Sequence, residues 1–68
     1  MTRVLYQLLD ELSDTQRTAF ILYELEGLSG EQLASITGAS VRTVWVRLSR
    51  ARHKFLAGMR AWEERERS

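Results

Sequence analysis

The sequence predicts an all-α fold, a small four-helix bundle, from three observations. Apolar residues recur three and four residues apart, the spacing that places side chains on one face of a helix. A serine followed three residues later by glutamine, a helix-capping signal, occurs twice before apolar runs. None of the 68 residues is proline, the strongest helix breaker. No cysteine is present to cross-link so small a domain, so helix packing or a partner must stabilise it.

The first two helices are expected over residues 2–12 and 14–26. "SDTQ" supplies Ser13 as the N-cap of the second helix and Gln16 as its capping-box partner. Gly27 stands where a helix ends in a left-handed residue, and Leu28 is expected to pack back on the last turn. The side chains expected to face inward are Leu5, Leu8, Leu9, Leu12, Ala19, Phe20, Leu22, Tyr23 and Leu25.

The stretch "SGEQLASITG" repeats this pattern in a shorter helix. Ser29 is the expected N-cap, Gln32 completes the capping box, and Gly38 ends the helix. Only two residues separate it from the next helix, and the second of them, Ser40, is the next N-cap. Two helices joined by a short turn with glycine form a helix-turn-helix, which we place at about residues 29–55. The expected apolar stripe of the short helix is Leu33, Ala34 and Ile36.

The last helix is expected to begin at Val41. Gly58 costs a helix about 1 kcal/mol relative to alanine, so we expect fraying or an end near it. The domain would then span residues 1–60, and the charged stretch 61–68 would be a poorly ordered tail. One arc of this helix is apolar and is the expected core face: Val41, Val44, Leu48, Ala51, Phe55 and Met59. The other arc carries Arg42, Thr43, Val46, Arg47, Ser49, Arg50, His53 and Lys54.

The net charge of +1 hides an uneven distribution of charge along the chain. Residues 1–31 carry six acids and two arginines, whereas residues 32–60 carry six bases and no acid. Residues 61–68 carry three acids and two arginines. A run of about 30 residues without an acid indicates a face that meets an anion, rather than an ordinary solvated face.

A basic face on the second helix of a helix-turn-helix is typical of a protein that reads the major groove of duplex DNA. Arginine can donate two hydrogen bonds to guanine, and lysine or arginine can neutralise phosphates. The alternative is a membrane-surface helix, which would need its apolar face uncovered. The other helices need that face for their only core, so we expect no membrane binding. The sequence also shows no secretory signal and no apolar run long enough to span a membrane.

Nothing in the sequence indicates catalysis, a metal site, a cofactor or a small-molecule substrate. It has no nucleophile–base pair and no glycine-rich phosphate loop. His53 is the single histidine, with no second type of metal ligand near it, so a surface or phosphate role is expected. The absence of cysteine fits a cytosolic protein.

The segment Leu12–Leu56 resembles the fourth conserved region of bacterial sigma factors of the extracytoplasmic-function (ECF) group. The motifs that carry the likeness are Leu12 and Arg17, followed by "ELEGLS", "EQLAS", "GASVRTV" and "RLSRAR". The resemblance implies a helix-turn-helix domain of the winged-helix-like or sigma region 4 type. In that family, the domain reads the minus-35 promoter element and docks on the flap of the RNA polymerase beta subunit. An anti-sigma factor often competes for the docking surfaces.

Carried over to this sequence, the resemblance assigns base-edge contacts to Arg42, Val46 and Arg47. It places Thr43, Arg50 and Lys54 nearer the phosphates. Arg17 and the helix N-terminus capped by Ser29 are further expected phosphate contacts, since free backbone N–H groups favour anions. The implied location is the bacterial cytoplasm.

The sequence departs from the family pattern at three positions. Ser13 replaces the usual proline, but serine can cap the same helix. Trp45 replaces a lysine or arginine, and Val46 replaces a small polar residue. Both changes remove a polar side chain from the helix that is expected to contact DNA, although Val46 can contact a thymine methyl group. Trp45 is expected either to pack over the edge of the domain or to face a partner protein.

Arg52 and Trp62 are also singled out. Arg52 projects toward the apolar side of its helix, so we expect an ion pair with Glu24 or Asp10 rather than DNA contact. Trp62 lies beyond the expected helix end, and both packing on the bundle and contact with a partner stay open.

Two other functions remain as alternatives to minus-35 recognition. One is a protein-interaction module, held by an anti-sigma factor or the polymerase, with weak DNA affinity. The other is a stand-alone transcriptional regulator. The sequence shows no segment that could melt a promoter or read a minus-10 element. We therefore expect either an excised domain or a protein that works only with others.

Overall fold

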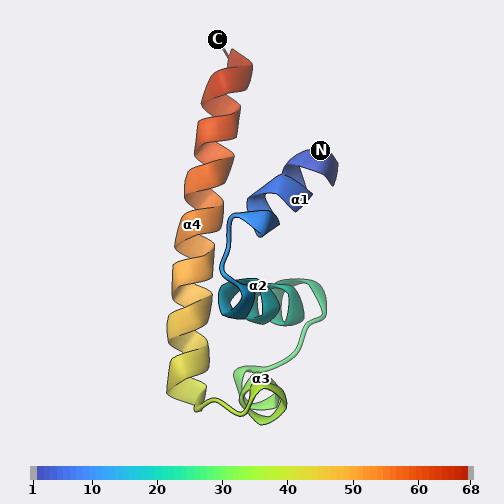
Figure 1. Cartoon of the computed structure of the whole chain (residues 1–68), viewed down its shortest axis with the longest axis vertical. Coiled ribbons are helices and arrows are strands. Elements are labelled where there is room, and N and C mark those ends of the chain that lie inside the picture. The colour runs from blue at the N-terminus through green and yellow to red at the C-terminus, as the bar shows by residue number, and fades with distance from the viewer. Residues whose placement is uncertain (1, 68) are drawn as a thin grey trace.

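The computed structural model describes residues 2–67, and these residues form helices joined by short turns (Figure 1). The described residues contain no β-strand, and the all-α prediction is confirmed. The elements, in chain order, are α1 (Thr2–Asp10), α2 (Asp14–Phe20), the π-helical turn η1 (Ile21–Leu25), α3 (Gly30–Thr37) and α4 (Val41–Arg67).

Helix α4 runs the length of the molecule, which measures 44 × 19 × 16 Å (Figure 1). Helices α1, α2 and α3 all contact α4 and lie on one side of it. Helix α3 lies beside the first turns of α4, and α2 crosses α4 between α3 and α1. As a result, α4 has one face in the core and an opposite face that no other element covers.

Two clusters of buried side chains form the core, and α4 contributes to both. Leu9, Leu12 and Phe20 surround Ala51 in the first cluster. In the second cluster, Ala19 and Leu33 pack against Val44 and Leu48. The three α4 residues are at most 2% exposed, so the expected core face is confirmed at Val44, Leu48 and Ala51. Burying such side chains is the main stabilising term available to a chain of this length.

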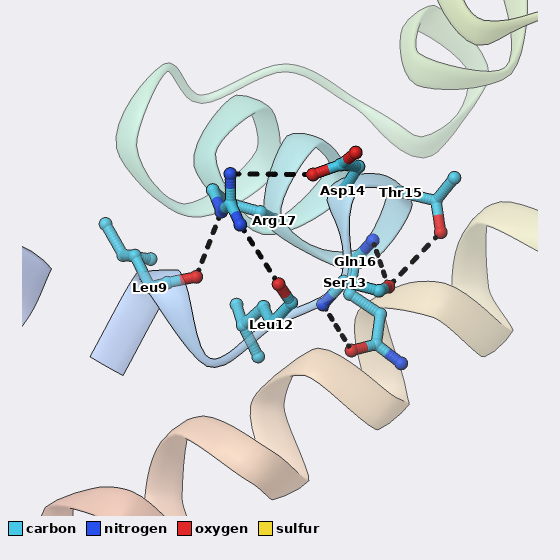
Figure 2. Close-up of polar contacts among 7 residues, drawn as sticks. All are labelled: Leu9, Leu12, Ser13, Asp14, Thr15, Gln16 and Arg17. Atoms are coloured by element: carbon cyan, nitrogen blue, oxygen red, sulfur yellow. Dashed lines mark hydrogen bonds and ion pairs between the residues drawn. The ribbon is translucent and has the colours of Figure 1, made fainter. Parts of the chain in front are cut away.

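The predicted helix starts are confirmed by the hydrogen bonds that cap them. The Ser13 hydroxyl accepts from the backbone N–H of Gln16, and the Ser13 N–H donates to the Gln16 side chain (Figure 2). Ser29 and Gln32 form the same reciprocal pair at the start of α3. These pairs satisfy backbone donors that the first turn of a helix leaves without partners.

The predicted glycine terminators are also confirmed. Gly27 and Gly38 have φ angles of 75° and 72°, the left-handed conformation that an L side chain disfavours. After Gly27, the N–H of Leu28 donates to the carbonyl of Leu22, and the Leu28 side chain packs on the second core cluster. The chain is thereby turned toward α3 within three residues.

The expected helix end near Gly58 is wrong, because α4 continues to Arg67. Gly58 lies where α1 crosses α4, and a Cβ atom at this position would overlap Cδ2 of Leu8. The glycine thus permits a close approach of two helices instead of ending one. Residues 61–67 are helical, so the expectation of a poorly ordered tail is wrong for them, and Ser68 lies outside the described residues. The division into a domain at 1–60 and a tail stays a prediction.

Three residues that were expected to face inward are exposed: Leu25 (58%), Ile36 (62%) and Val41 (39%). The wide π-helical turn, in which the Glu26 N–H donates to the carbonyl of Ile21, shifts Leu25 off the face that a regular α-helix would give it. Ile36 and Val41 flank the α3–α4 turn, which lies at one end of the molecule. None of the described helices is long and apolar enough to cross a membrane.

Candidate nucleic-acid interface

The uncovered side of α4 brings together six of the eight residues predicted to contact DNA. Arg42, Val46, Arg50 and Lys54 are exposed, and each lies four residues after the one before, so they form a row along the helix. Thr43 and Arg47 are half-buried and flank this row. We call this surface the basic face: Arg42, Thr43, Val46, Arg47, Arg50 and Lys54.

The first turn of α4 is held by a cap that involves a residue of the basic face. The backbone N–H of Thr43 donates to the Ser40 hydroxyl (3.1 Å), and this hydroxyl donates to the Thr43 hydroxyl (2.9 Å). The predicted cap at Ser40 is therefore confirmed. Because the cap fixes the N-terminal turn of α4, the backbone that carries the side chains of Arg42 and Val46 is held in a defined helical geometry.

The start of α2 lies beside the basic face. Asp14, Thr18 and Arg47 line one shallow hollow, and Gln16 lies with Arg50 and Lys54 around another. The hydroxyl and amide groups of α2 thus widen the polar surface around the basic residues. Asp14 is an acid beside this surface, and it reduces the positive potential near Arg47.

Lys54 is tied to the rest of the domain by a contact that the sequence did not suggest. Its Nζ donates to the backbone carbonyl of Glu11 at 3.1 Å, in the turn between α1 and α2. An ammonium group has three N–H donors, so this bond leaves donors for a phosphate. Its contact with DNA stays a prediction.

Arg17 closes the C-terminal end of α1 (Figure 2). Its Nε donates to the carbonyl of Leu9 at 3.0 Å, and its Nη2 donates to that of Leu12 at 3.1 Å. Nη1 lies 3.7 Å from a carboxylate oxygen of Asp14. The Leu9 carbonyl also accepts from the Leu12 backbone N–H at 3.1 Å, so the guanidinium is its second donor. By bonding to both carbonyls, the guanidinium fixes the turn into α2. The expected phosphate contact of Arg17 stays a prediction beside this structural role.

Ser29, the remaining predicted contact, is exposed at the start of α3. Its hydroxyl accepts from Gln32 and keeps its own O–H for another partner. The next residue, Gly30, lies against Trp45 of α4, which places the start of α3 beside the second turn of α4. Ser29 is therefore at the same end of the molecule as Arg42 and Val46.

Trp45 packs over the edge of the domain, one of the two roles expected for it. Its ring meets that of Tyr23 edge-on, with centroids 5.4 Å apart and planes at 77°. A Cβ atom on Gly30 would lie only 2.8 Å from Cζ2 of Trp45, so the indole sits directly on the glycine. The ring is still 44% exposed. Sequence reasoning missed both partners, although a glycine directly after an N-cap was a signal of close approach.

Arg52 pairs with Glu24 and not with Asp10, which resolves the two predicted partners. Its Nε donates to the Glu24 carboxylate at 2.6 Å, and its guanidinium lies over the ring of Tyr23, 5.5 Å from the centroid. The hydrogen bond and the charge of Glu24 raise the pKa of Arg52 above its ordinary value. The side chains are 51% and 32% exposed, so the pair lies at the surface.

A family model for sigma-70 region 4 matches residues 2–55. The chain belongs to the sigma-70 region 4 family. The resemblance to sigma region 4 found in the motifs is thereby confirmed, and region 4 is a DNA-binding family and not a catalytic one. No curated protein and no solved structure gave a significant match.

Membership in the sigma-70 region 4 family relates the arrangement of α3 and α4 to promoter binding. In sigma factors generally, region 4 binds the minus-35 element of promoters and works with RNA polymerase. The helix-turn-helix of this region 4 domain consists of α3, the turn at Gly38 and α4. The basic face lies on α4, the second helix of this helix-turn-helix.

Proposed function

We propose that this region 4 domain binds the minus-35 element of a promoter with α4 in the major groove. The observation that carries the proposal is the basic face, which gathers four cations on one side of a helix that packs against the core with its other side. The stretch from residue 32 to residue 60 contains no acid that would repel the phosphates. Phosphate neutralisation supplies most of the affinity in such complexes, and contacts with base edges supply specificity.

The roles of individual residues follow from their place on the helix. Arg42, Val46 and Arg47 belong to the first two turns of α4, which enter the groove most deeply in this motif. They are assigned to base edges. Thr43, Arg50 and Lys54 lie to the side or further along, and they are assigned to phosphates. Arg17 and Ser29 are assigned to phosphates next to the main contact.

We assign the domain to the ECF group of sigma factors, which places it in the bacterial cytoplasm. The support is the combination of "GASVRTV" and "RLSRAR" in one helix-turn-helix. The docking surface for the polymerase flap, and for a competing anti-sigma factor, is assigned to one hollow. It is lined by Phe20, Phe55 and Leu56 together with the Glu24–Arg52 ion pair. Leu56 is 57% exposed there, a large apolar side chain without cover.

A protein-interaction module is the second candidate function, and one observation favours it. Two apolar residues, Trp45 and Val46, stand among the reading positions and are 44% and 43% exposed. They cannot donate to phosphates as lysine or arginine would, apart from the single indole N–H. This alternative predicts weaker DNA binding together with strong binding of the polymerase flap.

The experiment is fluorescence anisotropy with a minus-35-type duplex and a scrambled duplex across a salt series. The proposal predicts tighter binding of the minus-35 duplex at every salt concentration. Arg50→Ala should weaken both duplexes alike and flatten the salt slope by up to about one unit. Equal, weak binding of both duplexes, with tight binding of a beta-flap fragment, would favour the interaction module instead.

A further inference from the structure

Val46 is an apolar side chain in the middle of the basic face. It is 43% exposed and belongs to neither buried cluster of the core. Arg42 precedes it by one turn and Arg50 follows it by one turn, both exposed. The isopropyl group therefore stands between two cations on the surface that is proposed to face DNA.

Folding does not explain a valine at this position. A β-branched side chain has a lower helix propensity than alanine or leucine, because its χ1 angle is restricted against the preceding turn. Since Val46 belongs to neither core cluster, burial in the core does not offset this restriction. An exposed valine among arginines is better explained by something that the face binds.

The chemistry of the side chain limits what it can recognise in DNA. Valine has no hydrogen-bond donor or acceptor, so it cannot pair with the polar atoms of a base edge. In the major groove, the apolar group on a base edge is the C5 methyl of thymine. The arginines on either side favour a phosphate-lined groove as the occupant over an apolar protein surface or an uncharged one.

The neighbouring residue, Trp45, anchors the second turn of α4. The indole rests on Gly30 at the start of α3 and meets Tyr23 edge-on. This contact ties the second turn of α4 to both preceding helical elements. The helix turn that carries Val46 is thereby fixed against the rest of the domain.

We propose that Val46 is a specificity-determining residue that reads one thymine through its C5 methyl group. The inference rests on the proposed function, since it requires α4 to lie in the major groove. It predicts that duplexes selected from a randomised pool by the wild-type chain carry a thymine at one fixed position. The same selection with Val46→Ala should lose the preference at that position and keep those set by arginine.

The test replaces thymines one at a time by uracil, which lacks only the methyl group, in the selected duplex. We expect one uracil to weaken binding of the wild-type chain about fourfold, the effect of removing one buried methyl-sized contact. For Val46→Ala, thymine and uracil at that position should bind equally. Arg50→Ala is the matched control, because it should weaken both duplexes and keep their ratio. Circular dichroism melting checks that Val46→Ala folds as the wild type does.

The outcomes separate this inference from the proposed function. If minus-35 duplexes are preferred but no uracil changes affinity, Val46 reads no methyl group and only this inference is overturned. The same conclusion follows if the uracil effect persists in Val46→Ala, because another residue then contacts the methyl. If the chain does not prefer minus-35 duplexes over scrambled ones, both proposals are overturned.

Discussion

Replacing Gly58 by alanine tests the finding that α1 crosses α4 closely at this glycine. In an open helix, the change would stabilise the fold by about 1 kcal/mol. Here the new Cβ overlaps Cδ2 of Leu8, a side chain that is only 6% exposed. Overpacking of a buried contact costs about 1–3 kcal/mol. The two effects leave a net destabilisation of up to about 2 kcal/mol, which would lower the Tm of so small a domain by roughly 8–16 °C at the upper end.

The assay is thermal and urea unfolding followed by circular dichroism, with two matched controls. Ala57→Gly, at the exposed neighbouring position, measures helix propensity alone and should cost about 1 kcal/mol. In a Leu8→Ala background the overlap is relieved, so Gly58→Ala should stabilise by up to about 1 kcal/mol. A rise in Tm on Gly58→Ala in the wild-type background would refute the close crossing, since helix propensity would then outweigh any steric cost.

Three further changes test the contacts around the candidate interface. Arg52→Ala should lower the Tm more than it lowers DNA affinity per folded molecule, and in a Glu24→Ala background its effect on Tm should shrink; a loss of affinity without a loss of Tm would contradict the ion pair. Gly30→Ala should lower the Tm because its Cβ would lie 2.8 Å from the indole, and the loss should disappear in a Trp45→Ala background. Arg17→Ala should destabilise by about 1–3 kcal/mol in urea unfolding, because the Leu12 carbonyl loses its charged donor and the Leu9 carbonyl keeps only the Leu12 N–H; unchanged stability would mean that water replaces the guanidinium without cost.

The helix starts could be predicted from the sequence because their signals are local. Ser13 with Gln16 and Ser29 with Gln32 each lie within four residues, and the hydrogen bonds they make need no other part of the chain. Gly38 is similar, because the left-handed conformation belongs to the residue itself. The buried face of α4 could also be predicted, since the spacing of its apolar residues decides which side meets the core.

The features that sequence reasoning missed depend on how the helices cross. Gly58 looked like a helix end because its contact with Leu8 exists only once α1 lies across α4. Leu25 was expected to be buried because nothing in the local sequence indicates the π-helical turn. The partners of Trp45 and the bond from Lys54 to the Glu11 carbonyl join segments far apart in the chain. The partner of Arg52 could be predicted although it is distant in the chain, because a charged residue on the core side of a helix is expected to pair with a nearby acid.

The central claim, that the basic face of α4 reads the sequence of a minus-35 element, is tested most directly at Arg47. The measurement is the ratio of equilibrium affinities for the minus-35 and scrambled duplexes, in the wild-type chain and in Arg47→Ala at one salt concentration. The account predicts that the wild type prefers the minus-35 duplex and that Arg47→Ala reduces this ratio roughly 5- to 150-fold, the loss of about 1–3 kcal/mol of base discrimination. An unchanged ratio in Arg47→Ala, or a wild-type ratio of one, would contradict it.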